Sequence, residues 1–235
     1  MKQVAFITDL HLNEPYPLGF EVTPEANLEV ILQDLHRRNI GEIIFGGDIG
    51  DVSAHALLFE RLAPYSLRVI PGNHDHIKDL ARHFENYPTP GQPYHSMEDE
   101  HFKQLFLDTS ADRIDTQQLE WLTEQLQTAK NLILFLHHPV LPVNTTADKL
   151  FPLQNRDVLA SLLLNQGREV NIFCGHYHMT DERSYQNINQ FITLSSSFQL
   201  VKDASALEVD NTTFGYRLIT LDGNKVSSEV ITFPC

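Results

Sequence analysis

The chain has 235 residues, of which 42% are hydrophobic; this is enough to bury the core of a large domain and excludes a disordered chain. Its net charge of −14 argues against a protein that binds nucleic acid polymers, because such proteins need a basic surface that displaces the counterions of the phosphates. No apolar run approaches the ~20 residues of a membrane helix. With no visible signal peptide and only Cys174 and Cys235, we expect a cytoplasmic protein that does not associate with a membrane.

The first third of the chain alternates strands with helices. The elements predicted there are a strand at 4–7, a loop at 13–24, a helix at about 24–38, a strand at 42–45, a helix at about 52–62 and a strand at 67–70. The first helix begins at Pro24 and has leucine and isoleucine at helical spacing. This order of elements is typical of a parallel sheet with right-handed crossovers.

The remaining two thirds predict more strands and fewer helices. The elements expected are a surface loop with short edge strands at 86–100, strands at 102–107, 132–136 and 170–174, a helix at 117–129 with Thr116 as N-cap, and a helix at 156–165 ended by Gly167. Beyond Phe191 we expect antiparallel strands at 191–194, 207–209, 216–221 and 226–233, with a hairpin turn at Asp222-Gly223-Asn224. Because no repeat or linker is visible, residues 1–235 are predicted to form a single domain, with two layers of mixed sheet and helices outside.

Five of the predicted strands end in side chains that bind metals. These are Asp9 and His11, Asp48, Asn73 with His74, His137 with His138, and His176 with His178. Sites in open α/β sheets lie beyond the carboxyl ends of the strands, so all five ends can face one crevice. Imidazole, carboxylate and amide donors without a thiolate suit Mn, Fe, Zn or Co. Because the donors are too many for one ion, we expect two ions with Asp48 as the bridging carboxylate.

Each motif also has an ordinary structural explanation when it is taken alone. Asp-x-His and Gly-Asn-His-Asp are good turn sequences, and Gly-Asp often precedes a helix. Their coincidence at five strand ends favours a metal site. His138 alternates to the other face from His137, so we expect it to contact the ligands or the substrate and not a metal. Cys174 is expected to be a buried apolar residue. The remaining histidines considered, which we expect at the surface or in the core, are His36, His55, His83, His95 and His101.

In their order along the chain, the motifs resemble the five sequence blocks of the calcineurin-like metallophosphoesterases. The matching segments are Asp9-x-His11, Gly47-Asp48-Ile49-Gly50-Asp51, Gly72-Asn73-His74-Asp75, Leu136-His137-His138-Pro139 and Gly175-His176-Tyr177-His178. The resemblance implies a four-layer α/β/β/α sandwich of two mixed sheets flanked by helices, and a two-metal centre of Mn, Fe or Zn. By position, Asp9, His11, Asp48 and His178 would hold the first ion, and Asp48, Asn73, His137 and His176 the second.

The same resemblance implies a mechanism. A water or hydroxide between two ions has a lowered pKa and attacks phosphorus directly. His74 would be the catalytic residue that lies over the phosphate and protonates the leaving oxygen. Asp75 would either orient His74 or cap a turn, and Asp51 would brace the loop that holds Asp48.

The expected substrate is a small-molecule phosphoester. Gly-Asn-His-Asp together with Leu-His-His-Pro is similar to the bacterial class III cyclic-nucleotide phosphodiesterases and their glycerophosphodiester-cleaving relatives, which implies hydrolysis of a nucleotide-like or glycerol phosphodiester. Phosphomonoesterase and nucleotide pyrophosphatase activities remain open, as does an inactive binding or scaffold module, although burying so many polar groups without a cation is costly. Substrate choice is expected to depend on loops 13–23, 86–100 and 139–154, whose aromatic residues (Tyr16, Phe20, Tyr87 and Tyr94) are candidates for stacking on a base.

Overall fold

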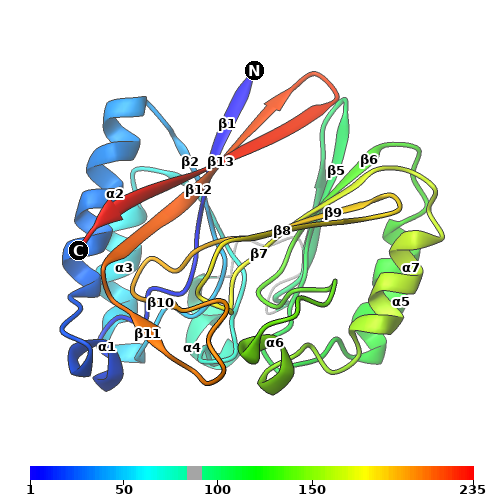
Figure 1. The fold of residues 1–235 in the computed structure, drawn as a ribbon. Helices are drawn as coiled ribbons and strands as arrows, with labels where there is room; N and C mark the ends of the chain where they lie inside the picture. The colour runs from blue at the N-terminus through cyan, green and yellow to red at the C-terminus, as the bar shows by residue number, and fades with distance from the viewer. Residues whose placement is uncertain (84–91) are drawn as a thin grey trace.

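The computed structural model describes residues 1–83 and 92–235, and its centre is a pair of β-sheets (Figure 1). The first sheet has the order β13-β12-β1-β2-β3. Its strands are β1 (Lys2–Ile7), β2 (Glu42–Phe45), β3 (Ser66–Val69), β12 (Thr213–Asp222) and β13 (Lys225–Pro234). The strands β1, β2 and β3 are parallel, whereas β12 and β13 are antiparallel. The sheet is therefore mixed, because the C-terminal hairpin pairs with the N-terminal strand.

The second sheet has the order β4-β5-β6-β7-β9-β8. Its strands are β4 (His95–Glu98), β5 (Phe102–Phe106), β6 (Asn131–Phe135), β7 (Val170–Cys174), β8 (Asp181–Tyr185) and β9 (Ile188–Ile192). The four central strands are parallel, and the edge strands β4 and β8 are antiparallel to their neighbours. A separate two-stranded ribbon joins β10 (Gln199–Leu200) to β11 (Val209–Asp210).

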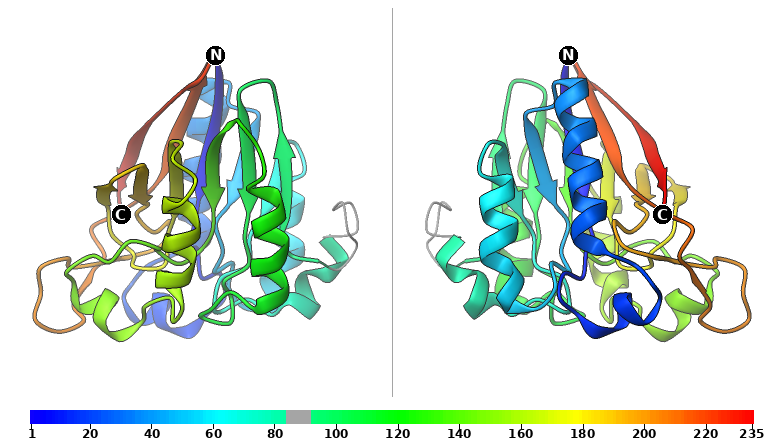
Figure 2. Two further views of the ribbon diagram at one scale, coloured as in Figure 1. Left: turned by 90° about the vertical axis from the view of Figure 1, so that its right-hand side faces the viewer. Right: turned by 90° about the vertical axis from the view of Figure 1, so that its left-hand side faces the viewer.

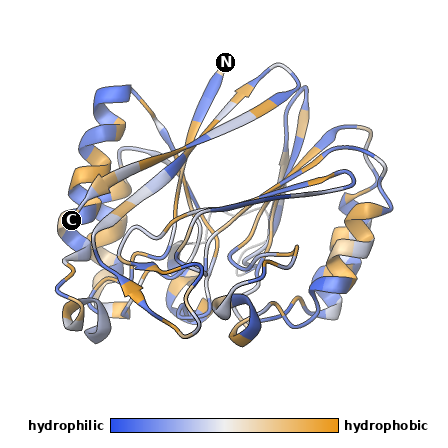
Figure 3. Cartoon of the chain, viewed as in Figure 1, coloured by the Kyte–Doolittle hydropathy of each residue, from blue (hydrophilic) through white to orange (hydrophobic). Residues whose placement is uncertain are grey.

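Helices cover the outer face of each sheet. In Figure 2, α2 (Pro24–Arg38) and α3 (His55–Leu62) lie over the first sheet, and α5 (Thr116–Gln125) and α7 (Arg156–Leu164) lie over the second. These helices carry both apolar and polar residues, as expected of helices with one buried face (Figure 3). Shorter helices, α1 (Pro15–Gly19), α4 (Ile77–Leu80) and α6 (Thr146–Leu150), lie at the lower end of the sandwich in Figure 1. Within residues 1–83 and 92–235, 3₁₀ turns span Val52–Ala54 and Ala81–His83.

Three apolar cores fill the three spaces between the layers. One joins the first sheet to α2 and α3, and another joins the second sheet to α5 and α7. The third lies between the sheets, where Phe6 of β1 stacks on Phe135 of β6 with ring centroids 6.0 Å apart. Phe135 is part of a row of rings that continues through Phe173 to Phe191. The predicted four-layer sandwich is therefore confirmed.

Most of the longer predicted elements agree with the structure, but the helix expected at 117–129 is α5, which ends at Gln125. The strand expected at 191–194, among antiparallel strands, is β9, which begins at Ile188 and runs parallel to β7. The predicted bounds of α2, β2 and β7 are those observed. The predicted loop at 13–24 is wrong in part because it contains α1, and the loop at 139–154 contains α6. The N-cap of α5 is Asp115, whose carboxylate accepts a hydrogen bond from Gln118 N, so the prediction of Thr116 was wrong. Within the expected loop at 86–100, β4 is an edge strand, and residues 84–91 lie outside the described residues.

Two further observations bear on the sequence predictions. The strand β8 was not predicted, because four of its five residues are exposed and it carries no apolar alternation. In the described part of the chain no helix is long and apolar enough to cross a membrane.

Candidate active site

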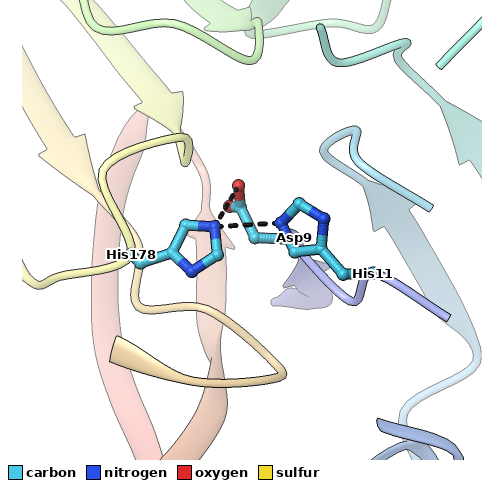
Figure 4. Close-up of side chains that lie close together, drawn as sticks. All are labelled: Asp9, His11 and His178. Atoms are coloured by element: carbon cyan, nitrogen blue, oxygen red, sulfur yellow. Dashed lines mark hydrogen bonds and ion pairs between the residues drawn. The ribbon is translucent and has the colours of Figure 1, made fainter. Parts of the chain in front are cut away.

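The predicted ligands lie where strands of both sheets end. Asp9 and His11 follow β1, Asp48 follows β2 and Asn73 follows β3, while His137 follows β6 and His176 and His178 follow β7. The structure brings their donor atoms together in two groups, each with all atoms within 4.8 Å: Asp9, His11 and His178, and Asp48, His137 and His176. Figure 4 shows the first group, in which Asp9 and His11, from the segment after β1, lie close to His178, from the segment after β7.

Asp48 lies between the two groups. Its Oδ2 atom is 3.2 Å from His137 Nε2 and 3.8 Å from His11 Nε2. In the first group His178 Nε2 is 3.0 Å from His11 Nε2 and 3.3 Å from Asp9 Oδ1. One carboxylate oxygen therefore faces a donor from each group, which is the arrangement expected of a bridging ligand.

Each of the four histidines in these groups has one ring nitrogen held by an acceptor outside the centre. The acceptors are Glu14 Oε2 for His11 Nδ1 (3.1 Å), the Gly46 carbonyl for His137 Nδ1 (2.8 Å), the Phe151 carbonyl for His176 Nε2 (2.9 Å) and the Phe198 carbonyl for His178 Nδ1 (2.9 Å). When each ring is neutral, donation of an N–H to its acceptor leaves the other ring nitrogen with a lone pair that a metal can accept. Metal-binding histidines in proteins are oriented in this way.

Two buried polar atoms at the centre fit a bound cation. His137 Nε2 and Asn73 Oδ1 are buried and make no hydrogen bond of good geometry among the described residues, although His137 Nε2 lies 3.2 Å from Asp48 Oδ2. A buried polar atom without a partner costs on the order of 1–3 kcal/mol, so its place in a folded protein calls for an explanation. Because both atoms belong to candidate ligands, a cation bound at the centre would supply the missing partner.

The backbone at the centre is strained. Five of the seven candidate ligands have positive φ angles, between 46° and 72°: Asp9, His11, Asp48, His176 and His178. Such conformations cost roughly 1–3 kcal/mol each in residues other than glycine and persist where the surrounding structure imposes them, often at functional sites. Two glycines allow the close packing, because a Cβ atom at Gly72 would clash with the Asp48 carboxylate and one at Gly175 with that of Asp9.

The centre holds more negative than positive charge, because its two buried carboxylates, Asp9 and Asp48, are both ionised. Burial by itself raises the pKa of Asp9 and of Asp48, but their histidine neighbours outweigh it and hold both pKa values below the usual range. Burial likewise lowers the pKa of His137, yet the two carboxylates raise it to about 10. In contrast, burial and the neighbouring His137 lower the pKa of His176 to about 3. The centre therefore keeps two buried carboxylates ionised, which suits a cation.

Of the two roles expected for Asp75, orienting His74 or capping a turn, the structure supports the second. Its Oδ2 accepts hydrogen bonds from the backbone N–H groups of Gly72 and Asp48, both at 2.8 Å, and its Oδ1 accepts one from Ile49 N at 3.0 Å. Asp75 thus caps the turn and braces the loop that carries Asp48. That role was predicted for Asp51, and the prediction was wrong, since the Asp51 carboxylate caps the neighbouring 3₁₀ turn through Ser53 N.

His138 lies outside both groups, as expected from its alternation with His137. Its Nδ1 is 2.9 Å from Thr109 Oγ1, and its Nε2 is 3.2 Å from Asp112 Oδ1. Its ring centroid is 4.0 Å from that of His176. His138 therefore packs behind one of the candidate ligands.

Glu14 and Tyr16 also belong to the site. From the sequence, Tyr16 was predicted only as a residue that stacks on a base, and Glu14 was not predicted. Glu14 Oε2 is 3.1 Å from His11 Nδ1 and 3.4 Å from His74 Nδ1. The Tyr16 hydroxyl lies 2.6 Å from the first of these nitrogens and 3.2 Å from the second. The only sequence signal for Glu14 is its position three residues after His11.

The centre opens onto a cavity of about 840 Å³. His11, Asp48, Asn73, His74, His176 and His178 line it, together with Tyr16 and Phe20 from the first of the three loops. Residues 150–152 and 154 of the third loop also line it, whereas none of the described residues of the second loop does. Tyr94 packs on Trp121 instead, with ring centroids 5.0 Å apart, and Tyr87 lies outside the described residues.

Comparisons with known proteins agree with this geometry. The sequence matches the calcineurin-like phosphoesterase family over residues 2–191. A probable cyclic nucleotide phosphodiesterase of Pseudoalteromonas sp. is 28% identical over 98% of this chain and 92% of its own length. A probable glycerophosphodiester phosphodiesterase of Arcobacter nitrofigilis is 30% identical over 85% of this chain and 80% of its own.

Comparison with solved structures agrees with the sequence match. A dimetal phosphatase from Danio rerio superimposes with a TM-score of 0.73 at 11% identity and covers 97% of this chain and 95% of its own, so the two share a fold. Calcineurin-like phosphoesterases use a dinuclear metal centre, and the two His/Asp groups are candidates for it. The chain belongs to the calcineurin-like phosphoesterase family and is a metal-dependent phosphoester hydrolase.

Proposed function

We propose that this protein is a dinuclear-metal phosphodiesterase that hydrolyses a small nucleotide-like or glycerol phosphodiester, with Mn, Fe or Zn as its metals. The observation that carries the proposal is the position of Asp48 Oδ2 between the two donor groups, at the floor of a cavity of about 840 Å³. The names of the bacterial relatives, which are probable phosphodiesterases for cyclic nucleotides and for glycerophosphodiesters, support the substrate class.

The proposed ligand sets use every candidate residue. Asp9, His11, Asp48 and His178 would hold one ion, and Asp48, Asn73, His137 and His176 the other. When bound, two such ions lower the pKa of a water molecule and neutralise the charge on a phosphate. The chain's own contribution would be the Asp48 carboxylate as a ligand common to both ions, together with imidazoles whose orientation is fixed by their outer acceptors.

His74 is the proposed proton donor to the leaving oxygen. It lines the cavity, and its Nδ1 lies within 3.4 Å of both Glu14 and Tyr16, which leaves Nε2 for a substrate. The hydrogen bond to Glu14 outweighs the effect of burial and raises the pKa of His74 to about 8. An imidazole protonated at neutral pH is suited to general acid catalysis.

Metal analysis and a hydrolysis panel test the proposal. With Mn²⁺ added, the protein should hydrolyse phosphodiesters faster than phosphomonoesters or pyrophosphates. Asp48→Ala should lose metal binding and activity together, whereas His101→Ala, which changes an exposed histidine, should keep both. An active Asp48→Ala enzyme would refute the ligand assignment, and a preference for monoesters would refute the substrate class.

The role of His74 needs its own variant. His74→Ala should keep the metal content of the wild type and lose roughly 10²–10⁴-fold in kcat, which is the usual range for a general acid. Elemental analysis checks the first expectation and steady-state kinetics the second. A variant that loses metal as well as rate would make His74 a ligand.

A further inference from the structure

The cavity above the candidate metal centre has a polar floor and an apolar wall. The floor consists of the histidine, aspartate and asparagine side chains described above. The wall comes from three segments far apart in the sequence, which are Phe20 after α1, residues 150–152 at the end of α6, and the β10–β11 ribbon with Phe198, Leu200, Leu207 and Val209. A phosphate over the floor would therefore place its organic group against apolar side chains.

The wall offers no positive charge. Among the described residues that line the cavity, none is lysine or arginine, and the polar residues away from the floor are Tyr16, Asp112 and Gln154. A second phosphate or a carboxylate on the substrate would meet Asp112 and no fixed cation. Anionic groups in proteins are most often bound by Arg, Lys or a metal, and the one cationic side chain proposed in the cavity, His74, lies at the floor; the wall therefore suits an uncharged group.

The wall is tied to the floor by hydrogen bonds from histidine side chains to backbone carbonyls. The Phe198 carbonyl accepts from His178 Nδ1, and the Phe151 carbonyl accepts from His176 Nε2, both at 2.9 Å. The Phe198 ring also packs 4.5 Å from the His178 ring and 5.1 Å from that of Phe20, measured between centroids. The position of the wall relative to a bound phosphate is thus fixed by the same histidines that are candidate ligands.

Part of the wall remains in contact with water. Leu150, Phe151 and Leu207 are 56%, 48% and 47% exposed, although each lines the cavity. Large apolar side chains gathered at the mouth of a pocket are typical of a binding site for an apolar group. Their burial by a substrate would contribute to binding in proportion to the area covered.

We propose that this wall is a subsite for the organic group of the substrate, and that it selects an uncharged, largely apolar group, such as an aromatic ring or a short hydrocarbon, on a single phosphoester. The inference rests on the proposed function for the position of the phosphate. It narrows the proposed substrate class to phosphodiesters that carry one negative charge, at the reacting phosphate, and no second anionic group. Within that class it favours a nucleotide-like diester over a glycerol diester, whose organic group is polar.

Direct binding of matched phosphonates tests the subsite without requiring turnover. The probes are O-methyl, O-glyceryl and O-phenethyl methylphosphonate, titrated by calorimetry into the Mn²⁺-loaded protein. Each buried methylene is worth about fourfold in affinity, so the phenethyl ester should bind at least ~10-fold more tightly than the methyl and glyceryl esters. The phenethyl ester should also show a more negative heat-capacity change, which marks burial of apolar surface.

Variants at the mouth of the cavity provide the second measurement. Leu150→Ser/Leu207→Ser changes two exposed side chains, so the fold should be kept, and the phenethyl-to-methyl affinity ratio should fall toward one. Val201→Ser is the matched control, because Val201 is 39% exposed on the same ribbon segment but is not among the residues lining the cavity, so it should keep the wild-type ratio. Equal binding of the phenethyl and glyceryl esters, or an unchanged ratio in the double variant, would overturn the inference.

Hydrolysis of bis(p-nitrophenyl) phosphate by the same preparations separates the two proposals. Hydrolysis without any preference among the phosphonates would refute the apolar subsite and leave the proposed function in place. A clear preference for the phenethyl ester without hydrolysis of any phosphodiester would refute the proposed function and support the subsite.

Discussion

The carboxylate of Glu14 lies between two imidazoles that have different proposed tasks. His11 is a candidate ligand and His74 is the proposed proton donor, and Glu14 Oε2 is within 3.4 Å of both. Burial alone raises the pKa of Glu14, but the hydrogen bonds to the two histidines outweigh it and lower that pKa to about 2. Glu14 is therefore an anion that positions both rings.

Glu14→Gln tests this positioning role. The protonated form of His74 is the donor, so the rate should fall as the pH rises through its pKa, which Glu14 raises to about 8. Without the carboxylate this pKa drops and the fall should move to lower pH, while kcat decreases by roughly 10–100-fold. The pH–rate profile is the measurement, and Glu25→Gln, an exposed glutamate in the first turn of α2, is the control. An unchanged profile in Glu14→Gln would assign Glu14 a purely structural role.

The sequence motifs predicted which side chains meet at the centre. They did not predict the residues, such as Glu14, that hold these side chains in place by hydrogen bonds. The strand ends containing Asp9, Asp48 and His137 were expected to share a crevice, and their side chains do come together. Glu14 was not predicted, because its place depends on left-handed backbone at His11 and Asn13, with φ of 53° and 58°. Histidine, asparagine and aspartate adopt left-handed backbone more often than most residues, but the sequence does not mark which of them do so.

At the scale of elements, α6 is fixed by one buried carboxylate. Asp148 accepts hydrogen bonds from the Tyr177 hydroxyl at 2.8 Å and from Val143 N at 3.2 Å, and it forms an ion pair with Arg156. Tyr177 lies between His176 and His178 in the sequence, so this network connects α6 to the candidate ligands. It also holds Phe151, whose carbonyl accepts from His176, at the C-terminal end of the helix.

Asp148→Ala should loosen this connection. Loss of the carboxylate leaves the buried Tyr177 hydroxyl without its partner, which should lower the free energy of unfolding by about 1–3 kcal/mol. Because the Phe151 carbonyl loses its fixed place, Mn²⁺ affinity should fall by about 10-fold or more. Denaturant unfolding and metal titration measure the two effects. Asp157→Ala, in the exposed first turn of α7, is the control, and equal metal affinity in both variants would contradict the proposed connection.

Elements in which apolar residues recur periodically over many positions were predicted well. Short elements and elements of polar residues were not. The helix α2 has seven buried positions on one face, and the hairpin of β12 and β13 turns through Gly223-Asn224 as expected. The helices α1, α4 and α6 have four or five residues each, fewer than two turns, so no period can develop. These short helices lie at the end of the sandwich where the site is, which is why the sequence described the core better than the walls of the cavity.

At the scale of the whole molecule, the proposed metal centre lies where the two sheets meet. Asp9, His11 and Asp48 come from the first sheet, and His137 and His178 come from the second. Away from the centre the sheets are joined by the ring stack of Phe6 and Phe135 and by Arg217 of β12, whose Nη2 donates to the Ile192 carbonyl of β9 at 3.1 Å. Cations held by both sets of ligands would therefore cross-link the sheets.

Chelation should consequently lower the thermal stability of the whole domain and not only abolish activity. A ligand at 100 times its dissociation constant adds about 2.7 kcal/mol to the stability of the folded state. In a chain of this length that corresponds to a Tm shift of roughly 5–10 °C. Scanning calorimetry with Mn²⁺ and then with excess EDTA measures the shift, and His101→Ala should show the wild-type value. Asp48→Ala should show almost none, because the variant lacks the carboxylate proposed to hold both ions. An equal shift in Asp48→Ala would mean that the stabilising ion binds elsewhere, and the absence of any shift in the wild type would mean that the sheets are held together by their apolar core alone.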